Sequence, residues 1–351
     1  MRVAVVGATG AVGRDLRRLL EERTFPCDEV VLVASERSAG GVLPFRGRDQ
    51  VIRALTDRDV FDGVDLALFS AGGSTSREHA PRAVEAGALV VDNSSAWRMD
   101  DEVPLVVVEV NPDTVGTPHR PPPKGIIANP NCTTMTAMLP LKALHDAFDL
   151  VGFTATSFQA AGGAGQKGID ELAAQIEPLF AAGDLLRSDG RSAAKLVEHH
   201  VHEATLAFNV VPLLGAEAAD GYTDEELKLV NESRKILGLP DLVVTPTCVR
   251  VPVTVGHSIA ISATFQRQVT AAAALSRMEG FPGLVVEHVP TPLEFAGRDE
   301  VAVGRVRADL FDPHVLNFFV VGDNLLKGAA LNTVQIAELL LARGLITAKQ
   351  R

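Results

Sequence analysis

The first 128 residues alternate between short apolar runs and segments with helical spacing. In residues 11–23, Leu16, Leu19 and Leu20 recur at the interval that puts them on one face of a helix, and 77–88 is a second predicted helix. The apolar runs are continuous, as in strands buried on both faces; they are 2–8, 28–36, 64–71, 88–96 and 105–113. This alternation predicts a doubly wound sheet of parallel strands, that is, a Rossmann-type domain.

The pattern changes after residue 132. Longer runs rich in β-branched and aromatic residues predict strands; they are 153–165, 245–265 and 314–324. A helix is predicted over 224–238 and a loop over 185–195. This combination is typical of an α+β domain with a mixed or antiparallel sheet. The last segment, 325–345, predicts an amphipathic helix.

Composition and charge narrow the class of protein. The chain of 351 residues is 46% hydrophobic, as expected for a globular protein with a sizeable core, and its net charge is −11. That charge disfavours nucleic acid or an anionic membrane as a partner, because both require basic patches. The chain leads directly into an apolar strand without the pattern of a signal peptide, and no apolar run approaches the length of a membrane span. We therefore expect a cytoplasmic protein.

A glycine-rich loop separates the first predicted strand from the first predicted helix. Gly7, Gly10 and Gly13 follow a G-x-x-G-x-x-G spacing rather than the commoner G-x-G-x-x-G. Glycines here let a phosphate approach the backbone, and the helix N-terminus stabilises its charge. The loop predicts dinucleotide binding, although a tight structural turn can have the same spacing. The candidate cofactor-binding residues in this loop are Gly7, Thr9, Gly10, Ala11 and Val12.

The end of the second predicted strand bears on the choice of cofactor. Ser35, Arg37 and Ser38 lie about where an adenosine ribose binds in this fold. An acidic residue would bond a free 2′-hydroxyl, whereas arginine and serine suit a 2′-phosphate. Glu36 argues the other way, but its side chain can point away from that of Arg37. The segment favours NADP over NAD.

Three cysteines, Cys27, Cys132 and Cys248, lie far apart in the sequence, which predicts neither a disulfide framework nor a cysteine metal site. Cys132 follows the polar sequence NPN and begins a segment with helix-like spacing. A helix N-terminus favours a thiolate, and its N–H groups can hold an oxyanion after attack on a carbonyl. An inert core thiol is the other interpretation, but such a thiol does not need a polar entrance. The polar entrance favours a nucleophile with the side chain of Asn131 as a donor beside it, but the residues alone leave both interpretations open.

A nucleophilic cysteine requires a base, and His257 is the candidate. It lies seven positions after Arg250, so a regular strand would put the two side chains on opposite faces. Pro252 and Gly256 make that alternation unreliable. Spacing alone therefore does not establish a pairing of His257 with Cys132.

A cluster of three histidines in the sequence VEHHVHEA raises the question of a metal site. His199, His200 and His202 have no other ligand-type signal around them. We therefore predict a polar surface segment and no bound metal.

Eight short motifs cover nearly the whole chain; they are GATGAVG, SERSAG, DNSSAWRM, NPNCTT, FQAAGGAG, EELK, RVPVTVGH and DNLLKGAALNTVQIAE. In composition and order they resemble the motifs of the aspartate-β-semialdehyde dehydrogenases. Each motif is modest in specificity, but the set is strong. The resemblance implies reversible, NADPH-dependent reduction of 4-phospho-L-aspartate to L-aspartate 4-semialdehyde with release of phosphate. This reaction belongs to the aspartate pathway to lysine, threonine and methionine.

The resemblance also implies a division of labour along the chain. Residues 1–131 would bind NADP, 132–323 would carry catalysis and homodimer formation, and the helix in 324–351 would pack on the NADP-binding domain. The nucleophile falls on Cys132, which would form an acyl-thioester, and the general acid and base on His257. The other implied catalytic residues are Gln159, which orients the substrate, and Asn131, which flanks the nucleophile.

The resemblance assigns binding roles as well. Arg250 would grip the α-carboxylate of the substrate, and Glu225 would meet its α-ammonium group. Arg98 and Lys228 would hold phosphate and supply the local positive charge that an acidic protein needs for an anionic substrate. The implied cofactor contacts after residue 132 are Gly162, Gly163 and Asn324. Gly162 departs from the family pattern, since many members carry serine there.

Three other functions are compatible with parts of this pattern. A short-chain reductase or epimerase uses a Tyr-x-x-x-Lys pair, but the single tyrosine, Tyr222, is followed four residues later by Glu226. A sister acyl-phosphate reductase, such as N-acetyl-glutamyl-phosphate reductase or glyceraldehyde-3-phosphate dehydrogenase, shares the cysteine–histidine chemistry, so mechanism alone does not separate it. A non-catalytic NADP-binding relative would be expected to lose the nucleophile or the base, and this chain retains both.

Overall fold

The computed structural model describes residues 1–347, which form two compact units. The first unit contains Met1–Asn131, Arg234–Pro240 and the C-terminal part from Leu325. The second unit contains Cys132–Ser233 and Asp241–Asn324. The last four residues of the predicted C-terminal segment, 348–351, lie outside the described residues.

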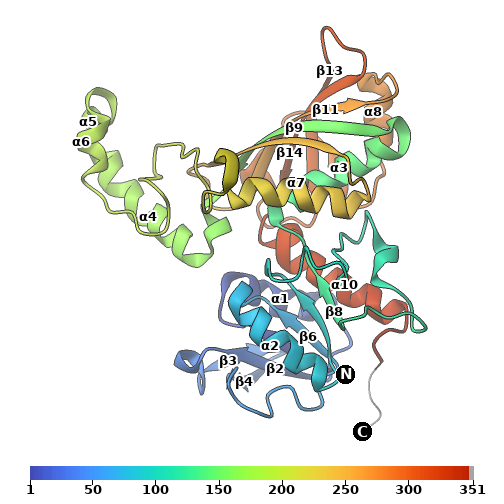
Figure 1. The fold of residues 1–351 in the computed structure, drawn as a ribbon. Helices are drawn as coiled ribbons and strands as arrows, with labels where there is room; N and C mark the ends of the chain where they lie inside the picture. The colour runs from blue at the N-terminus through green and yellow to red at the C-terminus, as the bar shows by residue number, and fades with distance from the viewer. Residues whose placement is uncertain (348–351) are drawn as a thin grey trace. The chain divides into compact units, whose positions relative to one another are not determined.

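The first unit is built on a six-stranded sheet in the order β5-β2-β1-β6-β7-β8, with all neighbours parallel (Figure 1). Its strands are β1 (Arg2–Val6), β2 (Glu29–Ala34), β5 (Arg53–Ala54), β6 (Leu66–Phe69), β7 (Leu89–Asp92) and β8 (Ile126–Ala128). A separate hairpin joins β3 (Val42–Phe45) to β4 (Arg48–Val51). The strand order reverses between β1 and β6, which is the topological switch point of a doubly wound sheet. The predicted Rossmann-type fold is therefore confirmed.

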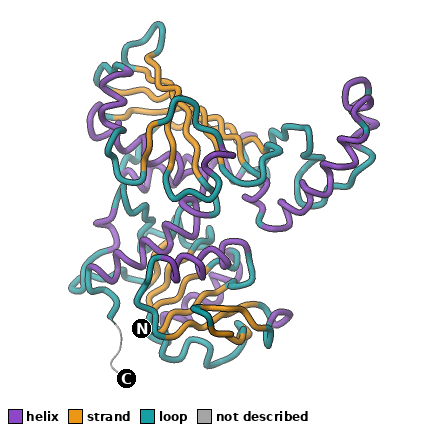
Figure 2. Tube along the Cα trace, turned by 180° about the vertical axis from the view of Figure 1, so that it is seen from behind, coloured by secondary structure: helices purple, strands orange, loops and turns teal. Residues whose placement is uncertain are grey.

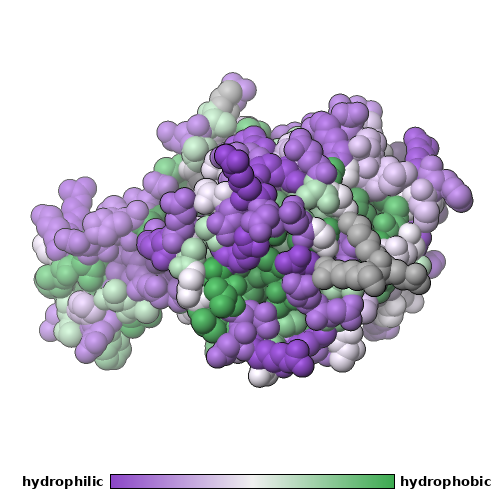
Figure 3. Space-filling view, turned by 90° about the horizontal axis from the view of Figure 1, so that it is seen from below, coloured by the Kyte–Doolittle hydropathy of each residue, from purple (hydrophilic) through white to green (hydrophobic). Residues whose placement is uncertain are grey.

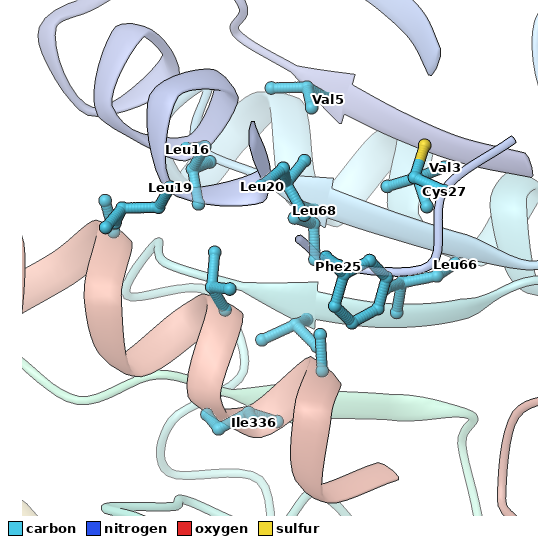
Figure 4. Close-up of a cluster of buried hydrophobic side chains, with 14 of the residues drawn as sticks. Val3, Val5, Leu16, Leu19, Leu20, Phe25, Cys27, Leu66, Leu68 and Ile336 are labelled. Atoms are coloured by element: carbon cyan, nitrogen blue, oxygen red, sulfur yellow. The ribbon is translucent and has the colours of Figure 1, made fainter. Parts of the chain in front are cut away.

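Three α-helices accompany this sheet; they are α1 (Ala11–Glu22), α2 (Gly73–Glu85) and α10 (Leu331–Ala342), the last preceded by a π-helix over Leu326–Ala330. Short 3₁₀ turns cover Glu36–Ser38 and Pro112–Val115. The apolar face of α1 lies in the same buried cluster as strand residues and Ile336 of α10 (Figure 4). Arg23 after α1 pairs with Glu338 of α10 at 2.8 Å. The C-terminal helix thus returns to the first unit, as predicted.

The second unit contains a six-stranded mixed sheet in the order β10-β9-β11-β14-β13-β12. Its strands are β9 (Leu150–Gln159), β10 (Val243–Arg250), β11 (His257–Phe265), β12 (Leu284–Val286), β13 (Val301–Ala308) and β14 (Val315–Gly322). The pairs β9–β10 and β12–β13 are parallel and the other neighbours antiparallel. The predicted mixed sheet is confirmed.

The helices of this unit are α3 (Cys132–Phe148), α4 (Gln166–Ala181), α5 (Gly183–Ser188), α6 (Gly190–Ala194), α8 (Ala271–Met278) and α9 (Pro292–Phe295), while α7 (Asp224–Leu237) begins here. Short 3₁₀ turns cover Ala161–Ala164 and Ala219–Gly221. Helix α3 packs against β9, β11 and β14 and thus covers one face of the sheet. The segment α4–α6 projects away from this sheet in both views of the chain (Figures 1 and 2).

Two predicted elements were wrong. Residues 105–113 form turns rather than a strand, and only Leu105 makes an isolated bridge, to Ala128. The reason is Asn111, whose side chain bonds both the N–H of Val107 and the carbonyl of Leu105 and so replaces the ladder partners of a strand. The predicted loop 185–195 contains helices α5 and α6, and the side chain of Asp189 caps α6.

No helix within residues 1–347 is long and apolar enough to cross a membrane. Figure 3 shows polar side chains over most of the face seen from below, with apolar side chains gathered in smaller areas.

Candidate active site

The glycine loop lies at the switch point of the first sheet, between β1 and α1. Gly7 has a φ of +87°, and a Cβ atom built on it would stand 2.2 Å from the carbonyl oxygen of Ser70, just after β6. A Cβ atom on Gly13 would stand equally close, 2.2 Å, to the carbonyl oxygen of Gly7. Packing therefore requires glycine at both positions.

Gly10 is different, because no contact within residues 1–347 requires a glycine there. Its φ of −75° is open to any residue, and an added Cβ atom would meet only the carbonyl oxygen of Gly7, at 3.4 Å. Gly10 stands at the N-cap of α1, where no side chain caps the helix and no acidic residue occupies the first turn. This leaves helix N–H groups for an anion at the edge where open α/β sheets bind nucleotides.

Ser35, Arg37 and Ser38 follow β2 in a 3₁₀ turn, with Ser35 and Arg37 exposed. The carboxylate of Glu36 accepts a hydrogen bond from the hydroxyl of Thr56 at 3.1 Å. The carboxylate of Glu36 is thus bonded to Thr56 rather than to Arg37, whose side chain is exposed. This agrees with the expectation that the two side chains can point in different directions.

Cys132 is the first residue of α3, and its Sγ atom lies 3.2 Å from Nε2 of His257, the first residue of β11. The imidazole is completely buried, and Nδ1 accepts a hydrogen bond from the backbone N–H of Ala160 at 3.1 Å. Burial, helped by the charge of Arg250, lowers the pKa of His257 to about 3, although Glu225 acts in the opposite direction. The structure therefore joins a half-buried thiol to a neutral, buried imidazole.

The other two cysteines have different surroundings. Cys27 and Cys248 are both buried, and burial raises the pKa of each thiol, that of Cys248 to about 12. Neither thiol is poised to ionise, so both behave as core residues. Cys132 alone of the three stands beside an imidazole.

Gln159, Glu225 and Lys228 form a polar chain in the second unit. The amide nitrogen of Gln159 donates to Glu225 at 3.0 Å and also to the hydroxyl of Thr133, beside Cys132. Lys228 contacts the other carboxylate oxygen of Glu225 at 3.1 Å and Asp224 at 2.8 Å. Burial would lower the pKa of Lys228, but these two carboxylates outweigh it and raise that pKa. The carboxylate of Glu225 is thus held at both oxygens.

Arg250 lies near His257 although the two residues belong to different strands, β10 and β11. Its Nη1 atom donates to the carbonyl oxygen of Ala160 at 2.6 Å. A Cβ atom built on Gly163 would stand 2.7 Å from this Nη1 atom and 3.3 Å from Nε2 of His257. The side chains of Arg250 and His257 therefore converge on Gly163. The expectation that they lie on opposite faces assumed one continuous strand, but Arg250 ends β10 and His257 begins β11.

Asn324 follows β14 and is almost fully buried. Its Oδ1 atom accepts a hydrogen bond from the N–H of Gly256 at 2.9 Å, whereas its Nδ2 atom is buried without a hydrogen-bond partner in the described part of the chain. Gly162 borders that nitrogen, since a Cβ atom added there would lie 3.6 Å from it and 2.8 Å from the carbonyl oxygen of Thr254. Position 162, where many family members carry serine, thus has no room for a side chain unless the backbone shifts.

Arg98 and Asn131 belong to the first unit and are both buried. Arg98 donates through Nε to the carbonyl of Asn129 at 2.9 Å and through Nη2 to that of Asn93 at 2.8 Å. The side chains of Asn93 and Asn129 bond each other at 2.6 Å. Arg98 is therefore held in one orientation by backbone carbonyls, which sequence reasoning did not foresee.

The predicted polar histidine segment is only partly right. His199 and His200 are exposed, but His202 is buried, with Nε2 at 3.2 Å from the carbonyl oxygen of Gly168. Burial lowers the pKa of His202. Glu171 accepts the backbone N–H groups of this segment and folds it inward. Within residues 1–347 no three His, Cys, Asp or Glu side chains are grouped as a metal site.

Comparison with known proteins places the chain in a family. Residues 2–117 match the model described as semialdehyde dehydrogenase, NAD binding domain, and 141–327 match semialdehyde dehydrogenase, dimerisation domain. An aspartate-semialdehyde dehydrogenase of Corynebacterium melassecola is 50% identical over 345 residues, which are 97% of this chain and 99% of the relative.

Two solved structures agree with this. The crystal structure of aspartate semialdehyde dehydrogenase II from Vibrio cholerae, complexed with ASA, has a TM-score of 0.89 and 40% identity and covers 97% of this chain and 98% of its own. Aspartate semialdehyde dehydrogenase with NADP from Candida albicans has a TM-score of 0.75 and 25% identity and covers 98% and 99%. The chain therefore belongs to the aspartate-semialdehyde dehydrogenase family.

Proposed function

We propose that this protein is an NADP-dependent aspartate-semialdehyde dehydrogenase that reduces 4-phospho-L-aspartate to L-aspartate 4-semialdehyde and releases phosphate, reversibly. The observation that carries the proposal is the 3.2 Å contact between Sγ of Cys132 and Nε2 of His257, in a chain 50% identical to such an enzyme along nearly its full length. The alternative, N-acetyl-glutamyl-phosphate reductase, shares the cysteine–histidine chemistry, so the similarity to the Corynebacterium enzyme is what favours aspartate semialdehyde.

The chemistry is covalent catalysis through Cys132. In the oxidative direction the thiolate adds to the aldehyde carbon and forms a C–S bond, and after loss of hydride this becomes an acyl-thioester. Phosphate then attacks the acyl carbon, the C–S bond breaks, and the thiolate is restored. The nicotinamide cofactor supplies the acceptor or donor of the hydride. His257 stands at hydrogen-bonding distance from the sulfur, where the implied acid and base must be.

Charged side chains of the second unit suit a free amino acid substrate. The planar guanidinium of Arg250 is matched to a carboxylate, and the carboxylate of Glu225 to an ammonium group. Lys228 is the proposed phosphate ligand, but its two present partners are Asp224 and Glu225, so phosphate would have to replace one of them. Arg98 is the second proposed phosphate ligand. Unlike Lys228, it is held in place by two backbone carbonyl groups. Gln159 would orient the substrate beside the sulfur.

The choice of NADP over NAD rests on the end of β2, where Arg37 is exposed next to serines and Glu36 is bonded to Thr56. The unpartnered Nδ2 atom of Asn324 is a donor suited to the nicotinamide carboxamide, which NAD and NADP share. A comparison of NADP with NAD in wild type and in Arg37→Ala tests this, because the variant should lose affinity for NADP only.

We also propose a homodimer formed through the second sheet. One face of this sheet is covered by α3, but on the other face Thr156, Ala260 and Phe319 remain half-buried on neighbouring strands. The rings of Phe158 and Phe319 pack together there at 6.2 Å between centroids. A partly exposed sheet face with small and aromatic residues among polar ones is suited to a second copy of the chain. The location in the cytoplasm stays a prediction.

The proposed activity is tested by following the absorbance of reduced cofactor with L-aspartate 4-semialdehyde and NADP, with and without phosphate. Phosphate-dependent reduction is expected in the wild type and in Cys248→Ser, the matched control at a buried cysteine, and its loss is expected in Cys132→Ser. N-acetyl-glutamate semialdehyde serves as the competing substrate. Turnover of that compound alone would replace the proposal by the sister activity.

A further inference from the structure

Asn129 follows β8 and is completely buried, yet its backbone and side chain both bond other residues of the first unit. Its N–H donates to the carbonyl oxygen of Asp92 at 2.8 Å, and its carbonyl oxygen accepts from Nε of Arg98 at 2.9 Å. Its side-chain amide donates to Oδ1 of Asn93 and accepts from Nδ2 of Asn332, both at 2.6 Å. A residue without exposed surface does not touch a substrate, so Asn129 acts on the candidate site through its neighbours.

The orientation of the Asn129 amide is dictated by the backbone, through Asn332 of α10. Nδ2 of Asn332 donates to the carbonyl oxygen of Val106 at 2.8 Å, and its Oδ1 accepts the N–H of Val108 at 3.2 Å. A backbone carbonyl only accepts and a backbone N–H only donates, so the amide of Asn332 has a single possible orientation. Its nitrogen therefore faces Oδ1 of Asn129, which directs the nitrogen of Asn129 to Oδ1 of Asn93.

Asn332 is in turn held by a buried ion pair. Lys327, in the π-helix before α10, donates to Oδ1 of Asn332 at 3.1 Å. Its ammonium group also donates to Glu109 at 2.5 Å and to Oε1 of Gln335 at 2.6 Å. Gln335 donates to the other carboxylate oxygen of Glu109 at 3.1 Å. A buried ammonium and carboxylate require such partners, so Asn332 presents its amide to Asn129 from a fixed base.

The effect of Asn129 on the candidate site falls on Arg98. Nε of Arg98 bonds the carbonyl oxygen of Asn129 after β8, and Nη2 bonds that of Asn93 after β7 at 2.8 Å. The side-chain bond between Asn129 and Asn93 joins the same two segments. We infer that Asn129 is a positioning residue, which holds these two carbonyls at a fixed spacing and so fixes the plane of the Arg98 guanidinium for a phosphate oxyanion. This deepens the proposed function and rests on it in taking Arg98 as a phosphate ligand.

The inference assigns Asn129 to one half of the reaction. In the oxidative direction, thioester formation on Cys132 and transfer of hydride to the cofactor come before phosphate takes part. Phosphate then forms a C–O bond to the acyl carbon, the C–S bond breaks, and its electron pair stays on the sulfur as thiolate. A misdirected Arg98 therefore weakens phosphate binding and the second half, and it leaves the first half intact. General damage to the site would impair both halves.

The test is Asn129→Asp in the full-length protein, which keeps an oxygen for Asn332 but replaces the donor to Asn93 by a second acceptor. We expect the KM for phosphate to rise about tenfold, while the KM for NADP and the burst of reduced cofactor without phosphate stay within about twofold of the wild type. Asn111→Asp, which loses a bond to the carbonyl of Leu105 instead, is the matched control and should keep the wild-type KM for phosphate. A folded Asn129→Asp with the wild-type KM for phosphate would overturn the inference, and so would an equal loss of the burst.

A second variant and a second measurement complete the test. If Asn129→Asp does not fold, Asn93→Ala breaks the same bond from a half-buried position and should raise the KM for phosphate about three- to tenfold, whereas an unchanged KM would overturn the inference. Titration of inorganic phosphate followed by ³¹P NMR compares binding without turnover. We expect weaker binding by the folded variant than by the wild type, and equal binding would contradict the role of Asn129. Because this measurement needs no aldehyde, its failure is distinguishable from a failure of the proposed function.

Discussion

The backbone of Gly7 lies against the carbonyl oxygen of Ser70, so closely that a Cβ atom on Gly7 would stand 2.2 Å from it. This contact joins the ends of β1 and β6 where the parallel sheet reverses its order. Gly10, three residues further on, has no comparable contact. The fold thus requires glycine at position 7, whereas at position 10 we propose that glycine leaves space for the cofactor.

We therefore expect Gly7→Ala and Gly10→Ala to differ in kind. Gly7→Ala should lower the free energy of unfolding by about 2–4 kcal/mol, because it combines a positive φ with a backbone clash. Gly10→Ala should leave the stability within about 1 kcal/mol but weaken NADP binding roughly tenfold, because its methyl group would occupy the space for the pyrophosphate. Thermal unfolding and calorimetric titration measure the two effects. Equal NADP affinity in Gly10→Ala and wild type would place the pyrophosphate elsewhere.

Arg250→Lys tests the grip on the α-carboxylate. Lysine keeps the positive charge but loses the planar pair of donors, one of which also bonds the carbonyl of Ala160. The KM for the semialdehyde should rise about 10- to 100-fold, with a smaller change in kcat. Steady-state kinetics at saturating NADP and phosphate give both constants. A KM that stays at the wild-type value would show that another cation binds the carboxylate.

Ala260→Arg tests the proposed dimer face. Ala260 is half-buried on β11 between Thr156 of β9 and Phe319 of β14, so an arginine there would place a charge in the middle of the interface. We expect a monomer by sedimentation or light scattering where the wild type is a dimer. Ala272→Arg, at an exposed position of α8, is the control and should remain dimeric. A dimeric Ala260→Arg would move the interface to another surface.

Acid should destabilise the fold partly through His257. Its pKa of about 3 in the folded protein lies below the ordinary 6.5, so between these values the unfolded chain binds a proton that the folded chain does not. The contribution to stability is therefore complete above about pH 6.5 and lost as the pH falls, by up to about 1.4 kcal/mol per unit. Denaturant unfolding between pH 7 and pH 4 should show a shallower loss for His257→Gln than for the wild type. Parallel curves for the two proteins would mean that His257 is readily protonated in the fold.

Periodicity predicted most of the fold because burial dictates it. The continuous apolar runs around β1, β2, β6 and β7 are needed wherever a parallel sheet is covered on both sides. The two wrong predictions lie where side chains bond the backbone. Asn111 bonds backbone groups within 105–113, which form turns instead of a strand, and Asp189 caps a short helix inside a polar segment predicted to be a loop. A single side chain of this kind leaves no periodic signal in the sequence.

The candidate site was predictable in its residue types but not in its geometry. A polar entrance to a helix pointed to Cys132, and resemblance supplied His257, yet no spacing could reveal that β10 and β11 turn Arg250 and His257 toward Gly163. Ala160 was missed altogether, since its contribution is a backbone N–H and a backbone carbonyl that any residue but proline would carry.

The most direct test of the account is the intact mass of the protein after mixing with L-aspartate 4-semialdehyde and NADP in the absence of phosphate. We predict that the wild type gains one aspartyl acyl group, located on the peptide that contains Cys132, and that added phosphate removes it. Cys132→Ser should gain no such group, and Cys248→Ser should behave as the wild type. An acyl group on another residue, or turnover by Cys132→Ser, would contradict the thioester mechanism.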